Sequence, residues 1–508
     1  MTPTLAPYSF TPSFASYNGI VADHTGQDYA ATANAMGPTA WTTFGRDAQH
    51  SAQSTTAAQP LNQIHWQTPV DLQPQYTGSI LFIHYGSPLI TMANTVVVPV
   101  KTGATDGFRV DAHAGSDGGL KWSVATDYVL PPHSWVPVFG PALAPGPRLY
   151  FPGAGGTVYF RDQVDATAGA SGQIAFYGLA NYQANPDAYN ANVMINTPIT
   201  SDPSGNIYFG FQVLGTTPLG VTSGIARIAA NGEATWTPVT TAAADGDMTE
   251  VPLNSAPALS MDLRTLYVAV SNGLVGYLVA LDSATLSPIA RVRLTDPKSG
   301  FDAGLSDNGT ASPAVGTDGD VYFGVLENPS GENNGRGWLL HFDSRLAQEK
   351  TPGAFGWDDT PSLVPVAMVP SYQGASPYLL MTKYNNYASG GGDGQNKIAI
   401  LDPSATQIDP VSQVSVMKEV LTIVGPTPDP GNGVTEWCIN SAAVDPLTKS
   451  VLANNEDGKL YRWDLTTNTL SEAMVLTSGL GEAYTTTVIG VDGQVYATNN
   501  ATLFAVGQ

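Results

Sequence analysis

Short runs of apolar, β-favouring residues recur along the chain, and turn residues separate them. In the clearest stretch, runs at 311–315, 321–325 and 338–342 follow one another, and the residues Thr317-Asp318-Gly319-Asp320 separate the first two. An Asp-Gly pair between two such runs is typical of a tight β-hairpin connection. The pattern therefore predicts three short antiparallel strands over residues 311–343.

The same pattern is repeated eight times in one order. The third run of a unit usually ends in an apolar residue followed by Asp, and a fourth run is clearest at 120–124 and 288–292. The first runs are 86–90, 140–144, 196–200, 255–259, 311–315, 361–364, 441–444 and 486–489, and the second are 96–98, 149–151, 207–209, 266–268, 321–323, 378–381, 451–453 and 495–497. Four short strands in each of eight units predict an all-β protein, an eight-bladed β-propeller with four-stranded antiparallel blades.

The two ends of the chain predict how the ring closes. The last unit ends after a third strand at 502–506, whereas residues 64–70 have the pattern of a fourth strand with no unit before them. Pairing these segments would complete the last blade and remove an exposed sheet edge. We therefore expect residues 1–40 to form a surface arm and residues 41–508 to form a single propeller domain.

Composition and charge exclude several classes of partner. Of the 508 residues only 12% are charged, with 20 Lys and Arg against 42 Asp and Glu, a formal net charge of -22. Phosphate contacts need clustered basic residues, so we expect no nucleic-acid partner. No run of eighteen apolar residues is present, and we expect no membrane insertion. We expect a monomer with a small-molecule or carbohydrate ligand.

Cysteine content and the first residues bear on the cellular compartment. The single cysteine, Cys438, cannot form an internal disulfide, and the first residues lack the basic start and apolar core of a signal peptide. The low basic content and the abundance of Thr, Ser, Asn and Gly resemble exported bacterial proteins. We expect a secreted or periplasmic protein whose signal peptide is absent from this sequence.

The segment 41–50 carries a resemblance to a known superfamily. Its residues Trp41, Phe44, Asp47 and His50 resemble a short signature that often begins PQQ-like propeller domains, the superfamily that includes the eight-bladed quinoprotein alcohol dehydrogenases. For the dehydrogenases of that superfamily, the resemblance implies a quinone cofactor under a vicinal Cys-Cys pair. It also implies a Trp beneath the cofactor and a Glu/Asn/Asp set around calcium or a lanthanide.

This chain departs from that dehydrogenase pattern in two respects. It has one cysteine, so the Cys-Cys pair is absent, and the blade motif of Asp followed by Thr-Gly and Trp is eroded at Asp282 and Asp464. These departures argue against bound PQQ. The cofactor is therefore left unknown, with calcium as the candidate ion.

The predicted fold indicates where a site would lie. The connections that enter the innermost strands and those that leave the second strands meet on one face, around the channel mouth. They supply a candidate acid–base group of His84, Tyr85, His133, Lys383 and Tyr384. An imidazole can act as a base near pH 7, a tyrosine can return the proton, and Lys383 could neutralise a carboxylate or stabilise an enolate.

The same connections supply candidate ligand-binding and metal-binding residues. The ligand-binding candidates are Trp135, Asn196, Glu250, Asn308, Glu436, Trp437 and Tyr484. Glu250 with Asp307 could offer oxygen ligands to a hard cation such as calcium. The alternatives stay open: the two tryptophans could pack between blades, and the two histidines could bond only to backbone at the channel rim.

Three functions from different classes fit these observations. The first is an exported propeller that binds a polar organic or carbohydrate ligand at the mouth and acts on it by His/Tyr/Lys acid–base chemistry, as a lyase or hydrolase would. The second is a divergent quinoprotein dehydrogenase that uses PQQ and calcium. The third is a scaffold without catalysis, which would bind partners through its rim.

Overall fold

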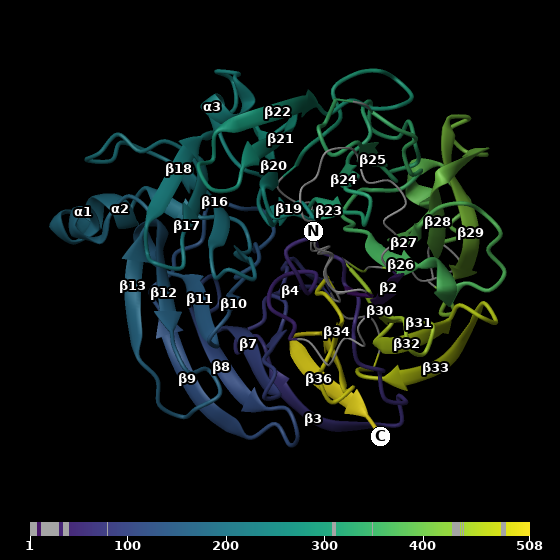
Figure 1. Ribbon diagram of the computed structural model, residues 1–508, viewed down its shortest axis with the longest axis horizontal. Coiled ribbons are helices and arrows are strands. Elements are labelled where there is room, and N and C mark those ends of the chain that lie inside the picture. Colours follow the sequence, from purple (N-terminus) through teal and green to yellow (C-terminus); the bar gives the residue numbers. More distant parts are fainter. Residues whose placement is uncertain are drawn as a thin grey trace, which may run out of the picture.

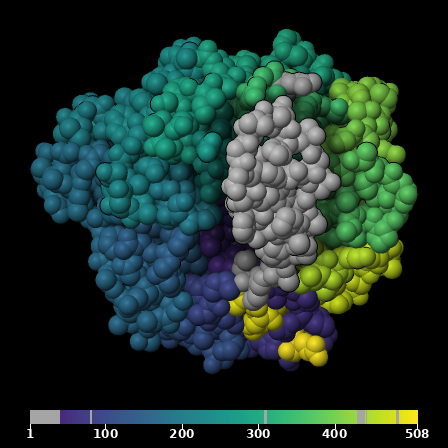
Figure 2. Space-filling model, in the orientation of Figure 1, coloured from purple at the N-terminus to yellow at the C-terminus, as the bar shows by residue number. Residues whose placement is uncertain are grey.

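Eight antiparallel sheets surround a central axis in the part of the chain that the structure describes. The computed structural model describes residues 8–11, 30–33, 40–78, 80–306, 311–347, 349–428, 437, 439, 441–478 and 484–508. The sheets follow one another around a disc in chain order, so that the first and last blades are neighbours (Figure 1). The colours of the space-filling view run around the molecule in the same order (Figure 2). The predicted all-β, eight-bladed propeller is confirmed.

Each blade is numbered by its place in the chain, and its strands run outward from the axis. Blades 1 to 4 are β6(Leu89–Ile90), β7(Thr95–Lys101), β8(Phe108–Ala114), β9(Leu120–Thr126); β10(Ala142–Ala144), β11(Arg148–Pro152), β12(Thr157–Arg161), β13(Ser171–Ala175); β14(Val193–Ile195) and β15(Thr200–Ser201) beside β16(Ile207–Val213), β17(Gly224–Ile228), β18(Ala234–Pro238); and β19(Ala258–Leu259), β20(Thr265–Ser271), β21(Gly276–Asp282), β22(Pro288–Arg293).

Blades 5 to 8 continue the ring in the same manner. They are β23(Ala314–Val315), β24(Val321–Val325), β25(Trp338–Phe342); β26(Ser362–Pro365), β27(Tyr378–Lys383), β28(Lys397–Ile408), β29(Ser415–Val424); β30(Ala443–Asp445), β31(Ser450–Asn455), β32(Lys459–Asp464), β33(Thr469–Val475); and β34(Val488–Ile489), β35(Val495–Asn499), β36(Thr502–Gly507), β3(Gln63–Pro69). In blade 5 the outer position is taken by residues 349–353, which make two isolated bridges to β25.

The remaining described elements are short. They are the pairs β1(Tyr8–Thr11) with β2(Ala30–Ala33) and β4(Tyr76–Thr77) with β5(Ile80–Leu81), the helices α1(Leu179–Ala184), α2(Pro186–Asn190) and α3(Val239–Ala243), and the 3-10 turns η1(Ala154–Gly156), η2(Val366–Met368) and η3(Ala388–Gly390). None of the described helices has the length and apolar character needed to cross a bilayer.

Burial along the strands explains the repeating sequence pattern. Every residue of the second strands β7 and β24 is buried, because these strands lie between neighbouring blades. The outer strand β33 alternates exposed and half-buried residues, since only one of its faces meets a neighbour. The apolar core is therefore made of layers between blades, and it extends around the ring.

The strand β3 closes the ring, as the ends of the chain predict. It pairs antiparallel with β36 from Gln63 opposite Gly507 to Pro69 opposite Thr502. The buried Trp66 side chain anchors it, and its indole Nε1 donates a 2.9 Å hydrogen bond to the Gly115 carbonyl of blade 1. This N-terminal strand thus joins the last blade to the first.

Residues 41–54, which we call the central segment, lie along the axis and touch one blade after another. Its bonds join Trp41 with Ile90 (blade 1), Thr42 O with Leu143 N (blade 2), Thr43 Oγ1 with Ile199 O (blade 3), Ala48 O with Leu259 N (blade 4), Gln49 O with Val315 N (blade 5), Ser51 O with Leu363 N (blade 6) and Ala52 O with Val444 N (blade 7), at 2.7–3.0 Å. Farther along, Gln59 N reaches Gly493 O of blade 8 at 2.8 Å. One stretch of chain therefore links all eight blades.

Side chains of the central segment fix its path. The buried His50 ring has its Nδ1 2.7 Å from the Pro313 carbonyl oxygen and packs edge-on against Phe44, and burial lowers the pKa of His50 to about 4. Asp47 accepts hydrogen bonds from the backbone N–H groups of Gln49 and Ser51. The residues that carry the Trp, Phe, Asp, His resemblance are thus the ones that hold the segment in place.

Replacing Gly45 by Ala should destabilise the protein by about 2 kcal/mol or more. Gly45 has φ of 61°, and an added Cβ would lie 2.8 Å from Cα and Cβ of His50. The matched control is Gly246→Ala, because Gly246 is exposed, does not need positive φ and has nothing within 4 Å of the added Cβ. The midpoint of urea unfolding measures both variants. Equal stability of the two variants would contradict the role given to the central segment.

Candidate functional site

Aromatic and charged side chains from four blades gather where chain segments enter the innermost strands. We call His84, Trp135, Asp359, Lys383 and Tyr484 the mouth cluster. The His84 ring stacks on Trp135 with centroids 5.2 Å apart, and the Tyr484 ring meets both at 5.5 Å, each edge-on. The Lys383 Nζ lies 5.7 Å from the Tyr484 ring centroid. Residues far apart in the sequence thus form one site at the mouth.

Hydrogen bonds position His84, and burial keeps its ring neutral. Its backbone N–H donates a 2.9 Å hydrogen bond to Val136 O, which sets the ring beside Trp135. Asn254 Oδ1 accepts the Val138 N–H at 2.7 Å, so the amide of Asn254 faces His84 Nδ1 at 3.3 Å as a donor. Burial lowers the pKa of His84 to about 3. His84 is therefore a neutral acceptor at ordinary pH.

Lys383 ends strand β27 and is buried among rings and carboxylates. Its Nζ lies 3.9 Å from Asp358 Oδ2 and 5.5 Å from the Phe355 ring centroid. A buried ammonium is stable where carboxylates and aromatic faces replace its water. The lysine therefore brings a positive charge to one face of the Tyr484 ring.

Asp359 is the acidic group of the cluster, and the sequence argument did not select it as a site residue. Burial raises its pKa to about 7, although the Thr382 hydroxyl hydrogen bond and the nearby Lys383 charge work in the opposite direction. A carboxyl group that titrates near neutral pH is typical of acid–base sites. In the sequence, the feature that could have indicated Asp359 is the pair Asp358-Asp359, which lies shortly before the innermost strand of blade 6.

Two tyrosines of the predicted acid–base group point away from the mouth cluster. Tyr85 Oη donates to Asp71 at 3.2 Å, beside the buried ion pair of Asp71 with Lys101. Tyr384 is buried against Lys397, whose Nζ lies 5.2 Å from its ring centroid, and burial raises the pKa of its hydroxyl well above the usual value. Successive residues of an extended chain point to opposite sides. Consequently each tyrosine faces away from its neighbour in the cluster.

The structure places the other described candidates apart from one another. His133 is exposed, with Nδ1 2.7 Å from Pro131 O, and Trp135 takes the place beside His84. Trp437 is buried in the core beside Tyr461, with ring centroids 5.5 Å apart. Asn196 Nδ2 donates to Val251 O at 2.5 Å, and Glu250 Oε2 accepts from Gln212 at 2.6 Å. Asp307, Asn308, Glu436 and Cys438 lie outside the described residues.

The described residues do not fit the quinone and calcium site that the resemblance implies. No group of three or more His, Cys, Asp or Glu side chains within the described ranges could hold a metal ion. The mouth carboxylates are already engaged, Asp359 with the Thr382 hydroxyl and Asp358 with Lys383. We therefore derive no chemical step through a quinone or a metal ion.

Comparison with known proteins agrees with the architecture. No family model and no curated protein matches the chain. Among solved structures, a europium-containing methanol dehydrogenase is similar over 91% of this chain and 89% of its own, at 12% identity and a TM-score of 0.53. The quinohemoprotein alcohol dehydrogenase from Comamonas testosteroni is similar over 92% and 81%, at 12% identity and a TM-score of 0.54. The chain has the quinoprotein-like propeller fold.

A third structure extends the likeness beyond these two dehydrogenases. Sqt1 from Saccharomyces cerevisiae is similar over 89% of this chain and 100% of its own, at 10% identity and a TM-score of 0.50. At such identities the likeness concerns the fold alone. The quinoprotein-like propeller is therefore established here as a framework, and its activity has to be argued from the mouth cluster.

Asp359→Asn should change how stability depends on pH. The unfolded carboxyl titrates near its ordinary pKa of 3.8 and the folded one at about 7, so between these values the native state binds the extra proton. The stability contributed by Asp359 is therefore complete below about pH 4 and falls as the pH rises to about 7. The free energy of unfolding of the wild type, minus that of the variant, should therefore fall by on the order of 2–4 kcal/mol across this window.

Urea unfolding at closely spaced pH values measures this difference. Asp187→Asn, on the exposed surface of α2, serves as the matched control and should show no such slope. A difference between wild type and Asp359→Asn that is independent of pH would contradict the raised pKa.

Proposed function

We propose that this protein is an exported propeller that binds a polar organic ligand, specifically a carbohydrate, at the mouth cluster. The observation that carries the proposal is the meeting of the Trp135 and Tyr484 rings above His84 and Lys383. Aromatic faces suit the apolar C–H faces of a sugar ring, while imidazole and amide groups can exchange hydrogen bonds with its hydroxyls. Trp135 and Tyr484 are half-buried, so their rings keep accessible surface.

The charges of the cluster favour a neutral carbohydrate over an acidic one. The Lys383 ammonium is accompanied by Asp358 at 3.9 Å and by Asp359, whose pKa responds to it. These carboxylates offset the lysine charge, so no net positive field is directed at a substrate carboxylate.

One observation favours a second function, acid–base catalysis on the bound ligand by a lyase or hydrolase. Asp359 has a pKa of about 7 and lies beside Lys383, so this pair can hold or release a proton near neutral pH. His84, with a pKa of about 3, does not share that role. In this proposal Asp359 is the group that holds or releases the proton, and the charge of Lys383 favours its ionised form.

Ligand binding should raise the melting temperature of the purified protein, because a ligand that binds only the native state stabilises it. We expect cellobiose or maltose to raise it more than glucuronate does, since the cluster carries no excess positive charge. Trp135→Ala should weaken binding of the responding sugar at least about tenfold by calorimetry. Lys418→Met, on the exposed face of β29, is the control variant and should bind the sugar like the wild type. If neither sugar changes the melting temperature, the carbohydrate proposal fails and a binding scaffold becomes the better description.

Catalysis is tested separately on whichever sugar binds. Asp359→Asn should abolish product formation, followed by NMR of the sugar, while its dissociation constant stays within about twofold. The activity of the wild type should change with an apparent pKa of about 7, the value that burial gives Asp359. Binding without any turnover from pH 5 to about 9 would leave a binding protein and refute the catalytic proposal.

Export is the remaining part of the proposal. It is supported by the single cysteine and the low number of basic residues. Detection of the protein in the periplasmic or culture fraction of its host tests it. Recovery only from the cytoplasm would refute it.

A further inference from the structure

A cavity of about 480 Å³ lies on the face opposite the mouth cluster. Its lining comes from Ala40 and the central segment, from the turns that join the innermost and second strands of blades 1, 2 and 3, and from Asp165 in the connection between β12 and β13 of blade 2. The entering connections and these turns lie at opposite ends of the innermost strands, so the cavity is separate from the mouth. Its volume falls in the range of about 300–1,000 Å³ that is usual for small-molecule sites.

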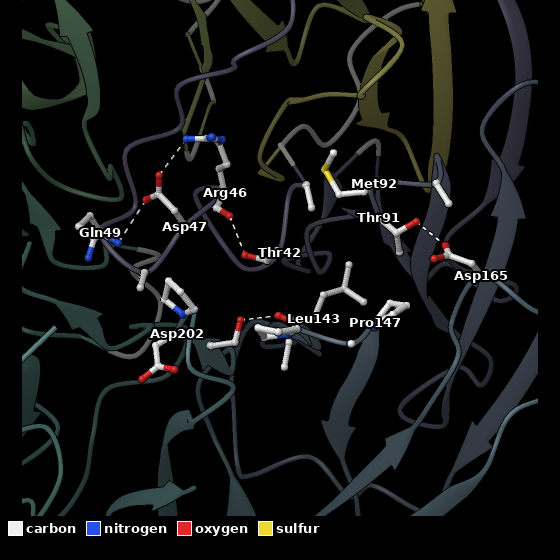
Figure 3. A pocket seen from close by; sticks show the side chains of 18 residues that line it. Thr42, Arg46, Asp47, Gln49, Thr91, Met92, Leu143, Pro147, Asp165 and Asp202 are labelled. Carbon is white, nitrogen blue, oxygen red and sulfur yellow. Dashed lines mark hydrogen bonds and ion pairs between the residues drawn. The ribbon is translucent and has the colours of Figure 1, made fainter. Parts of the chain in front are cut away.

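The walls of this cavity are mainly apolar. Met92, Leu143 and Pro147 line it together with several further alanines and prolines, and Figure 3 shows their side chains around the space. The Leu143 N–H is bonded to Thr42 O at 2.7 Å, and Ser201 Oγ donates to Leu143 O at 2.5 Å. Because the central segment ties the neighbouring turns together, the cavity is preformed and a ligand would need little rearrangement.

The charged groups around the cavity decide the class of ligand. Asp47, Asp165 and Asp202 are in its lining, and they come from three different segments (Figure 3). Arg46 is the basic residue in the lining, and its Nη1 lies 3.1 Å from Asp47 Oδ2. Three carboxylates against one guanidinium leave an excess of negative charge, on a chain whose formal net charge is -22. That excess attracts a cation and repels an anion.

We propose that this cavity is a second ligand site, and that it takes a small organic cation with an apolar body, such as an aryl-alkyl amine. The apolar body would lie against Met92, Leu143 and Pro147, and the ammonium group would face the Asp165 carboxylate, because Asp202 is bonded within its own turn and Asp47 to Arg46 and its own segment. Asp165 is half-buried and accepts a 2.5 Å hydrogen bond from Thr91 Oγ1, which orients its carboxylate at the side of blade 1. The site is independent of the mouth cluster and of the function proposed for it.

Three probes with one ring system separate shape from charge. Tryptamine is the cation, tryptophol its neutral counterpart and indole-3-propionate its anionic counterpart. Calorimetry on the full chain should give saturable binding of tryptamine with a Kd below about 1 mM, about tenfold weaker binding of tryptophol and no binding of the acid. Equal affinity for the three probes, or no saturation by tryptamine, would overturn the proposal.

Variants then place the probe in this cavity. Asp165→Asn keeps an acceptor for the Thr91 hydroxyl but removes the negative charge. It should weaken tryptamine binding about tenfold and leave tryptophol binding unchanged. Ala93→Trp fills the cavity from an exposed turn and should abolish binding of both. Asp187→Asn, on the exposed surface of α2, should bind tryptamine like the wild type.

An independent readout locates binding even if a variant fails to fold. The Met92 methyl group lines the cavity and is exposed, so in protein with labelled methionine methyls its NMR signal should shift on titration with tryptamine. Met92→Leu assigns that signal. A shift of other methionine signals with Met92 unchanged would put the probe elsewhere and overturn the proposal.

Discussion

The hydrogen bonds between the central segment and the innermost strands are the interaction on which the ring depends. Each innermost strand is an edge of its blade, and that edge faces the axis rather than bulk water. A buried backbone N–H or C=O without a partner costs about 1–3 kcal/mol, so an unfilled axis would be expensive for a ring of this size. The central segment supplies partners to seven blades in succession, and Gln59 extends the series to the eighth.

The path of the central segment follows from its own backbone. Gly45, Arg46, His50 and Ala52 have positive φ, at 61°, 81°, 59° and 52°, and these residues bend the chain repeatedly within a short length. The bends direct successive carbonyl groups toward successive blades. The strand β3 then follows within a few residues and completes blade 8. The same stretch of chain thus fills one end of the axis and closes the ring.

Filling one end of the axis separates two chemical environments. At the mouth, His84, Asp359 and Lys383 are buried beneath the half-buried Trp135 and Tyr484, and desolvation drives the pKa of His84 down and that of Asp359 up. At the opposite face the central segment forms a wall of the apolar cavity, where carboxylates outnumber basic groups. One propeller therefore carries two environments of different polarity, a cluster of buried ionisable groups at the mouth and an apolar cavity at the opposite face.

Local patterns were enough to predict the fold and the side of the ring on which to look. Runs of apolar residues, turn residues and the unmatched strand at 64–70 depend only on neighbouring residues, and each corresponds to observed strands. The mouth assignment of His84, Trp135, Lys383 and Tyr484 also came from their positions before or after particular strands. Their contacts with one another are now visible in the structure.

Contacts across the ring and the degree of burial were decided only by the tertiary structure. Tyr85 and Tyr384 are sequence neighbours of cluster residues, yet the alternation of an extended chain turns them toward Asp71 and Lys397. Asp359 gains its pKa of about 7 from desolvation, which no neighbouring residue encodes. The sequence by itself determined strands, their order and ring closure, because these follow from local periodicity. The tertiary structure decided which side chains meet and which protons they hold, because both depend on residues hundreds of positions apart.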